Sequence, residues 1–397
     1  MAWYVNDAGD VVGMGDNAQG NAHPLLVATK GSAAFQVIDL GTLGGEEKAM
    51  DFTVIGMAIN NQGLVVGHAH TAAGPLHAFA WTRDGGMVDL GTLEPGTSSA
   101  AMGVNDRGVI VGWAGASSFW GPDTVAVAWI PKGNGWELTK LADDLNTSAF
   151  AINNAGQIIG GYDMYNQPKG LRWEPLPDGK GWRMQTIETP AGFPFFYADA
   201  SNEAGLGAGW VVPTDGSTFT KSIPAVWKPG DGPGSTGQVT VLATLANPAK
   251  GPNYADGMND VGDIVGLSSD DSGTQQAVAW RIGAEGTVIS LGLPGGEGLS
   301  VNNWGVVAGY GSATNGQIHA FIVRLRPECQ GQLSNGKFQL TITGSAEAHY
   351  TIEACSDLRS PWLPIGDVTA SDGTVTFTDP SPADVGARFY RAVSAGP

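Results

Sequence analysis

Two aspartates, Asp199 and Asp256, have the positions in this chain that best suggest acid–base chemistry. Each lies three residues before an asparagine of a recurring sequence pattern. The other copies carry apolar residues there, namely Trp3, Met57, Met102, Phe150 and Leu299. Paired, partly buried carboxyls can take different pKa values and divide acid and base roles, or bind a cation. The alternative is that each accepts backbone hydrogen bonds or faces channel water, so both remain candidate catalytic residues.

Three histidines, His68, His70 and His77, lie close together in the second copy of the pattern. Alternate residues of a strand point to the same face, and imidazole is a common ligand of divalent metal ions. His68 and His70 are therefore candidate metal ligands. No second ligand cluster of matching type is obvious in the sequence, and the alternative is that two of the three histidines face solvent.

Aromatic residues gather in the third to fifth copies, in or beside segments of variable length. Rings on an exposed rim stack on sugar faces or on apolar ligand groups. The alternative is that long loops fold over one another and bury the rings as a small core. The candidate ligand-binding residues are Trp113, Trp120, Tyr162, Tyr165, Phe196, Tyr197 and Trp210.

These residues are positioned by a pattern that occurs seven times, which we call the marker. It consists of an apolar residue, Asn, two variable residues, Gly, three mostly apolar residues and a second Gly. Its internal spacing is constant, whereas the distance between copies varies, so insertions fall between markers. The marker asparagines are Asn6, Asn60, Asn105, Asn153, Asn202, Asn259 and Asn302.

Each copy predicts four short strands, as residues 56–60, 64–67, 77–81 and 87–93 illustrate. Asn and Gly between the first two strands suit a tight turn, because Asn bonds its own backbone and Gly supplies a positive φ. A tryptophan recurs in the third strand and would anchor the packing of neighbouring sheets. Small residues two positions before most marker asparagines suit strands that crowd around an axis.

Four-stranded units of about 40–50 residues, repeated in this way, are typical of a β-propeller. The prediction is therefore an all-β chain with a seven-bladed β-propeller over residues 1–326. An open solenoid is the competing arrangement, but no polar capping repeats are visible. The pattern stops before a fourth strand in the last copy. The seventh blade either has three strands or takes its fourth from residues outside the pattern, including residues upstream of Met1.

Residues 327–397 differ in composition and predict a small C-terminal β-sandwich. Short strands at 338–342, 350–353, 375–378 and 388–391 are separated by Gly, Ser, Asp and Pro. The two cysteines of the chain, Cys329 and Cys355, lie in this region. They would form one disulfide in an oxidising compartment or remain two thiols.

The segments INNQGLVVG (59–67), HAFAW (77–81) and MVDLGTL (87–93) resemble the HAF-type extracellular repeat family. The resemblance covers about residues 1–325 and implies a secreted bacterial protein, but it implies no activity. The segments YTIEACSDL (350–358), FTDP (377–380) and RFYRA (388–392) resemble small immunoglobulin-like modules of secreted proteins from environmental bacteria. Such modules space, anchor or adhere.

The charge balance excludes some classes of partner. With 38 acidic and 20 basic residues, the formal net charge is −18, which repels nucleic acids and acidic membrane surfaces. No apolar run approaches the roughly 18 residues of a membrane-spanning helix. Met1 leads directly into the first copy of the pattern, as in a secreted or cell-surface protein whose signal peptide has been removed.

The sequence therefore favours a secreted binding or scaffold protein that recognises an extracellular glycan, peptide or small molecule. The binding face would be the one built from the variable loops, because such loops on a rigid scaffold carry function. The alternative is a hydrolase or lyase acting on a glycoside, ester or phosphoester, with Asp199 and Asp256 at the axial cavity. A purely structural role is the third hypothesis.

Overall fold

The computed structural model shows an all-β protein. It describes residues 1–28, 36–45, 55–116, 123–162, 169–189, 192–193, 195–213, 221–230, 237–246, 250–312, 317–326, 328–334, 337–343, 348–356, 361–371, 374–380 and 389–394. Within these ranges there is no helix of the length and apolar character that a bilayer crossing requires. The chain divides into two compact units, of which the first comprises Met1–Asn303 and Val307–Ile322 and the second Trp304–Val306 and Val323–Pro397.

The first unit contains antiparallel sheets of consecutive strands. The first sheet consists of β1 (Ala2–Val5), β2 (Val11–Asp16), β3 (Ala22–Ala28) and β4 (Gln36–Asp39). The second consists of β5 (Ile55–Ile59), β6 (Val65–His70), β7 (Leu76–Thr82) and β8 (Gly86–Asp89). The third consists of β9 (Ser98–Val104), β10 (Ile110–Ala116), β11 (Val125–Lys132) and β12 (Gly135–Lys140).

The remaining sheets of this unit follow the same order. The fourth consists of β13 (Thr147–Ile152), β14 (Ile158–Tyr162), β15 (Lys169–Pro175) and β16 (Trp182–Thr186). The fifth consists of β17 (Phe196–Ser201), β18 (Gly207–Val211), β19 (Ile223–Lys228) and β20 (Gln238–Val241). The sixth consists of β21 (Tyr254–Met258), β22 (Asp263–Ser269), β23 (Gln275–Arg281) and β24 (Ile289–Pro294). The seventh has three described strands, β25 (Glu297–Val301), β26 (Val306–Ser312) and β27 (Ile318–Arg324).

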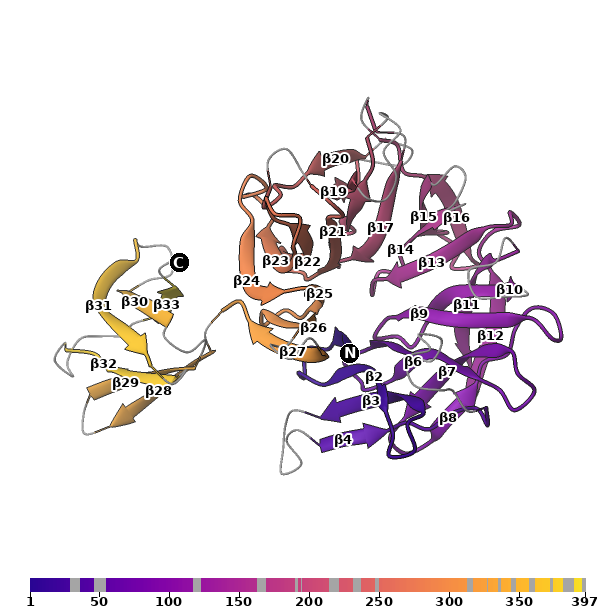
Figure 1. Cartoon of the computed structure of the whole chain (residues 1–397), viewed down its shortest axis with the longest axis horizontal. Helices are drawn as coiled ribbons and strands as arrows, with labels where there is room; N and C mark the ends of the chain where they lie inside the picture. The colour runs from indigo at the N-terminus through magenta and orange to yellow at the C-terminus, as the bar shows by residue number, and fades with distance from the viewer. Residues whose placement is uncertain are drawn as a thin grey trace. The chain divides into compact units, whose positions relative to one another are not determined.

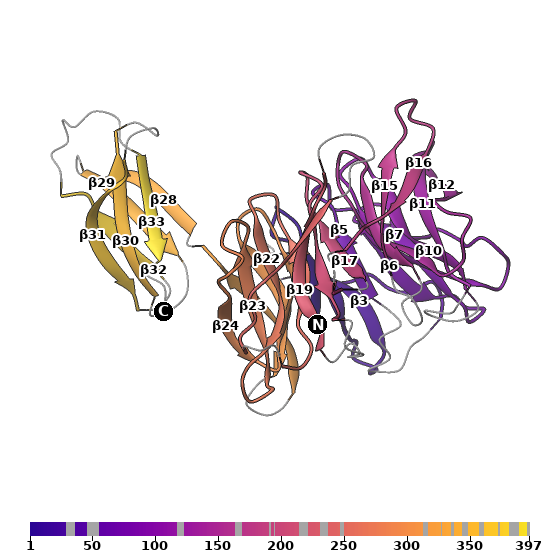
Figure 2. The same ribbon diagram turned by 90° about the horizontal axis from the view of Figure 1, so that it is seen from above.

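The sheets of the first unit surround a common axis. Figure 1 shows them following one another with the first strand of each sheet innermost, and Figure 2 shows the same sheets from the side. The innermost strands contact one another in a closed cycle, in which β1, β5, β9, β13, β17, β21 and β25 follow in order and β25 contacts β1. The close approach explains the small residues of these strands. A Cβ at Gly257, for example, would lie 2.7 Å from the backbone oxygen of Leu299.

The marker turns have the local structure that the sequence predicts. In the second sheet the Oδ1 atom of Asn60 accepts hydrogen bonds from the backbone N–H groups of Gln62 and Leu64, at 3.1 and 2.9 Å. Gly63, the first marker glycine, has a φ of 81°, which a residue with a Cβ rarely adopts. The corresponding glycine of every other marker also has a positive φ.

Each marker asparagine also bonds to the next sheet, which the turn pattern did not predict. Its Nδ2 group donates to the backbone oxygen of the following marker asparagine, as from Asn6 to Asn60 at 3.0 Å. The same bond recurs around the unit and ends with Asn302 donating to Asn6 at 2.9 Å. Seven asparagine side chains thus form one closed circle, which fixes the positions of the inner strands.

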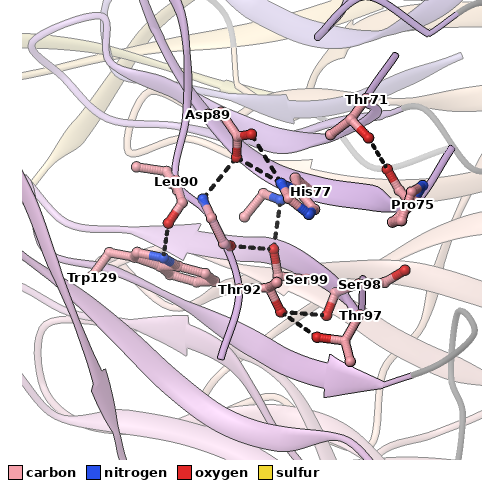
Figure 3. A network of polar contacts seen from close by, with 12 residues as sticks. Thr71, Pro75, His77, Asp89, Leu90, Thr92, Thr97, Ser98, Ser99 and Trp129 are labelled. Atoms are coloured by element: carbon pink, nitrogen blue, oxygen red, sulfur yellow. Dashed lines mark hydrogen bonds and ion pairs between the residues drawn. The ribbon is translucent and has the colours of Figure 1, made fainter. Parts of the chain in front are cut away.

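The recurring tryptophan anchors neighbouring sheets, as predicted. The fully buried indole of Trp129 in β11 donates its Nε1 hydrogen bond to the backbone oxygen of Leu90, just after β8 (2.9 Å; Figure 3). Trp173 and Trp280 make the equivalent bonds to Leu141 and Ala243. An N–H group that would be costly to bury alone therefore joins one sheet to the preceding one.

The second unit contains two further antiparallel sheets. One consists of β28 (Glu328–Ser334), β29 (Lys337–Thr343) and β32 (Thr374–Thr378). The other consists of β30 (Ala348–Cys355), β31 (Leu363–Ala370) and β33 (Phe389–Ser394). Their core combines Leu340 and Ile342 of the first sheet with Tyr350 and Ile352 of the second. Cys329 and Cys355 are not joined in a disulfide.

Candidate functional site

The innermost strand of every sheet in the first unit contains a β-bulge at the same place. The register with the second strand shifts around the residue three positions before the marker asparagine, as between Ala198 and Ala200 and between Ala255 and Gly257. A bulge leaves one residue unpaired and re-aims its side chain. The seven bulged residues are Trp3, Met57, Met102, Phe150, Asp199, Asp256 and Leu299.

The second marker glycine makes these bulges possible. A Cβ on Gly209 would lie 1.8 Å from the backbone oxygen of Tyr197, which the bulge pushes toward the neighbouring strand. Gly112 and Gly266 face the oxygens of Ala100 and Tyr254 at 1.9 and 2.0 Å in the same way. The glycine that the sequence places seven residues after each marker asparagine is therefore needed to aim the bulged side chain.

All seven bulged side chains line one axial cavity of about 490 Å³. The first four sheets and the seventh contribute apolar side chains to its wall, whereas the fifth and sixth contribute Asp199 and Asp256. The prediction that these two carboxyls reach a common cavity agrees with their placement. Among the described residues that line the cavity there is no lysine or arginine.

Burial strongly shifts the titration of Asp199. Loss of solvation raises the pKa of its carboxyl to about 8, although a hydrogen bond from the Trp210 side chain opposes the shift and the charge of Glu297 adds to it. At neutral pH the Asp199 carboxyl is therefore mostly protonated. It can act as a hydrogen-bond donor, or it can ionise when a cation compensates its charge.

Asp256 belongs to a group of carboxyls that also includes Glu297. Tyr310 donates a hydrogen bond of 2.5 Å to Glu297 Oε2, and the protonated Asp256 donates a second bond to Glu297. Burial raises the pKa of Asp256 well above its ordinary value, and the charges of Glu297 and Asp199 raise it further. The Oδ2 atom of Asp256 has no hydrogen-bond partner among the described residues. This part of the cavity therefore holds a proton that a cationic group could replace.

Sequence reasoning missed Glu297, although a signal was present. It lies five residues before its marker asparagine, where the other copies carry Met1, Ile55, Ala100, Ser148, Tyr197 and Tyr254. Glu297 is thus the one charged residue at that position. Comparing the copies at the position five residues before the marker asparagine, as at the position three residues before it, identifies Glu297.

An aromatic group lies against the carboxyls. Tyr197 lines the cavity, and Trp210 stacks on it with ring centres 4.9 Å apart and planes 26° apart. Phe150 contacts the Tyr197 ring at 5.1 Å, and Tyr254 contacts the Trp210 ring at 5.5 Å. Phe150 and Tyr197 thus line the cavity beside the carboxyls, and Trp210 and Tyr254 belong to the same aromatic cluster without being among the lining residues.

The prediction of an exposed aromatic rim is wrong for the rings that can be placed. Trp113 and Phe196 are completely buried, and Trp210 and Tyr197 are nearly so. Trp113 packs against Ala100 and Met102, and Phe196 lies in the core between the fourth and fifth sheets, so neither can stack on a surface ligand. Trp120 and Tyr165 lie outside the described residues, as does the side chain of Tyr162.

The metal site predicted from His68 and His70 is not assembled. His68 lines the axial cavity, where burial lowers its pKa to about 3 and keeps the ring neutral. The His70 Nδ1 atom instead bonds to the backbone oxygen of Gly74, and His77 pairs with Asp89. In the part of the chain that the structure describes, no three His, Cys, Asp or Glu side chains are grouped as a metal site.

A second, smaller cavity of about 120 Å³ lies at the marker turns. Its polar lining includes the residues that follow the marker asparagines, which are bonded in a circle of their own. The Asp7 backbone N–H donates to Asn61 Oδ1 at 2.9 Å, and the Asn303 N–H donates to Asp7 Oδ1 at 2.9 Å. Tyr4 lines both cavities. The carboxylates of this circle serve as acceptors within the fold.

No known family model matches the chain, and no curated protein matches it in sequence. Solved structures similar to it include the β-propeller domain of the Trilobed protease from Pyrococcus furiosus, which has an open velcro topology. That chain is 10% identical, with a TM-score of 0.49, over 81% of this chain and 92% of the other. An acylaminoacyl peptidase from Pyrococcus horikoshii is 8% identical, with a TM-score of 0.47, over 88% and 59%. A post-proline cleaving enzyme from Rickettsia typhi is 9% identical, with a TM-score of 0.33, over 85% and 50%.

Proposed function

We propose that this protein is an extracellular binding protein of the HAF-repeat type, whose first unit is a seven-bladed β-propeller that holds a small organic cation in its axial cavity. The second unit would be a β-sandwich module that spaces or anchors the propeller. The observation that carries the proposal is the placement of Asp199 and Asp256 in a wall otherwise made largely of aromatic and apolar side chains.

The chemistry of the wall favours a positively charged ligand. Removing carboxylates from water is costly unless a counter-charge is supplied, and no lysine or arginine supplies one among the described lining residues. An ammonium group would compensate the two aspartates, and aromatic faces such as those of Trp3, Phe150 and Tyr197 attract cations through their π-systems. The volume of about 490 Å³ is that of a small-molecule site.

The evidence for a ligand lies at the axis and not at the surface rim. The rings that suggested sugar stacking are buried where they can be placed, so the loop face loses its main support as a glycan site. A neutral sugar could still bond to protonated carboxyls, which makes it the competing ligand class in the test below.

One observation also favours an acid–base enzyme. Two carboxyls with raised pKa values, Asp199 and Asp256, line one cavity, and Asp256 shares a hydrogen bond with Glu297, which can separate its proton affinity from that of Asp199. Such a division is what a hydrolase or lyase uses for its acid and base. Turnover of chromogenic glycosides, esters or phosphoesters that is lost in Asp199→Asn would establish this second candidate function.

Calorimetric titration with matched ligands tests the binding proposal. Benzyltrimethylammonium and its uncharged carbon isostere, neopentylbenzene, have nearly the same shape. We expect the cation to bind at least ten-fold more tightly, and Asp199→Asn or Asp256→Asn to remove that preference. Asp84→Asn is the matched control, because Asp84 is exposed in the turn between β7 and β8. Equal affinity for both ligands, preference for a neutral sugar, or binding of neither ligand would contradict the proposal.

A further inference from the structure

The outer strand of the seventh sheet has an open edge among the described residues. In each of the other six sheets the third strand lies between the second and the fourth, as β7 lies between β6 and β8. Among the strands that the structure describes, β27 of the seventh sheet pairs with β26 only. The backbone N–H and C=O groups on its other side are those that a further strand would bond.

Comparison of β27 with β7 shows which apolar side chains are exposed in the seventh sheet. Both strands contain His-Ala-Phe, at 319–321 and 77–79. Leu76 and Ala80 of β7 are 4% and 1% exposed, whereas their counterparts Ile318 and Ile322 in β27 are 48% and 43% exposed. In the second sheet this face of β7 packs against the third sheet, where Ala80 joins a cluster with Ile110 and Trp129, and Leu90 after β8 packs against the same cluster. The same positions that are core in the second sheet are therefore apolar surface in the seventh. An exposed apolar edge strand is a template for pairing with another chain.

The histidine of this motif indicates which residue a fourth strand beside β27 would carry. In the second sheet His77 Nδ1 lies 2.9 Å from Asp89 Oδ2 of β8 (Figure 3), and Asp89 Oδ1 accepts a hydrogen bond from Gly91 at 2.7 Å. In the first sheet His23 makes the same pair with Asp39 of β4 at 2.7 Å. His319 occupies this position in β27, but no carboxylate pairs with it in the described residues.

We propose that β27 binds an extended segment of a partner polypeptide by strand addition, and that this segment carries the sequence apolar-Asp-Leu-Gly. The Asp would pair with His319 as Asp89 pairs with His77, so it would lie diagonally across from the histidine and directly opposite Phe321, the counterpart of Phe79. The Leu of the segment would pack on the face that carries Ile318 and Ile322. Backbone bonds provide affinity in such pairing, and the side chains at alternate positions provide specificity.

The pairing of β7 with β8 also shows which backbone groups of β27 are free. The Leu90 N–H donates to the Ala78 oxygen, so Ala78 and, by the alternation of a strand, Ala80 point their backbone groups toward β8. Ile322 is the counterpart of Ala80. Its N–H group therefore lies on the open edge, and Ile322→Pro removes that donor while the bonds from β27 to β26 are kept.

A fluorescent peptide, GMVDLGTL (residues 86–93), tests the proposal against the full chain by anisotropy. We expect saturable binding that weakens at least five-fold when the peptide Asp is changed to Asn, and a similar loss in His319→Ala and Ile322→Pro. Hydrogen exchange should slow at β27 when the peptide binds. His349→Ala is the control variant, because His349 is an exposed histidine of β30 in the second unit.

Several results would overturn the proposal. Equal affinity for the Asp and Asn peptides, or unchanged binding in His319→Ala, would show that the histidine does not select the strand. Absence of binding to the native chain would show that the edge does not accept a strand in trans. Sedimentation that reveals a dimer, lost in Ile322→Pro, would assign the edge to a second copy of this chain. Because the Asp→Asn change is in the peptide, a folding defect in one protein variant does not decide the outcome.

Discussion

The side-chain amide of Asn302 donates a hydrogen bond of 2.9 Å to the backbone oxygen of Asn6, a residue 296 positions earlier in the chain. Three more bonds join the same ends, from the Val5 N–H to Ser300 Oγ, from the Asn303 N–H to Asp7 Oδ1 and from Asn303 Nδ2 to Asp7 Oδ2. Among the described strands, none from the last sheet pairs with the first sheet. Closure of the circle therefore depends on side-chain bonds and on the packing of β1 against β25.

Replacement of Asn302 tests the importance of this closure. Asn302→Ala removes the buried donor to Asn6, whose backbone oxygen keeps the bond from the Gly9 N–H but loses the one that closes the circle. We expect the free energy of unfolding to fall by about 1–3 kcal/mol. Urea unfolding measures the change, with Lys132→Ala as control, because the exposed ion pair of Lys132 with Glu137 contributes under about 1 kcal/mol. An Asn302→Ala protein as stable as the control would show that packing alone closes the circle.

Gly209→Ala tests the role of the second marker glycine. The added methyl would lie 1.8 Å from the Tyr197 oxygen, so the bulge that carries Asp199 must move. We expect a loss of about 3 kcal/mol in unfolding free energy, together with loss of cation binding. Gly135→Ala is the matched control, because nothing lies within 4 Å of its added Cβ and its φ is not positive. Equal stability of the two variants would contradict the account of the bulge.

The raised pKa of Asp199 predicts how stability depends on pH. The folded protein keeps the Asp199 proton up to a pKa of about 8, whereas the unfolded chain releases it near the ordinary pKa of 3.8. Between these values the folded state binds more protons, so this group's contribution to stability is complete below pH 4 and is lost as the pH rises toward 8. The unfolding free energy of Asp199→Asn, relative to the native protein, should therefore rise with pH across this window. A constant difference in parallel urea titrations from pH 4 to pH 8 would disprove the shift.

The bond between Asp256 and Glu297 predicts a coupled effect of mutation. The charge of Glu297 and its hydrogen bond both raise the pKa of Asp256, so Glu297→Gln should lower the pKa of Asp256 toward its ordinary range. Infrared difference spectra across a pH titration would show the protonated carboxyl band of Asp256 disappearing at a lower pH in the variant. Asp256→Asn identifies the band. An unchanged titration midpoint would mean that burial alone sets the pKa of Asp256.

Much of the strand pattern could be predicted because it depends on short-range rules. The apolar alternation, the Asn and Gly of each turn, and the recurring tryptophan all report local geometry that the chain repeats. The bond from each asparagine to the next sheet could not be predicted, because it joins residues 43 to 57 positions apart, or 296 at the closure. Asp199 and Asp256 stand out when the residues three positions before the marker asparagines are compared. Glu297 stands out only at the position five residues before the asparagine.

The aromatic residues show why exposure is harder to predict than strand position. The composition of a loop-rich segment is equally compatible with an aromatic ring at a surface binding site and with a ring in the core. Phe196 and Trp113 are buried because they begin or continue strands whose faces meet the neighbouring sheet. Burial depends on which sheet lies opposite, and that is a property of the assembled unit.

The number of protons released per bound cation tests the central claim most directly. Calorimetric titration of benzyltrimethylammonium at pH 7, in buffers of different ionisation enthalpy, gives this number, and the permanent charge of the ligand contributes no proton of its own. Because Asp199 and Asp256 both have raised pKa values in the free protein, an ammonium ion beside them should release about one proton at pH 7, and changing both to Asn should abolish the release. Binding without proton release, or equal release in the double variant, would contradict a cation site at the axial carboxyls.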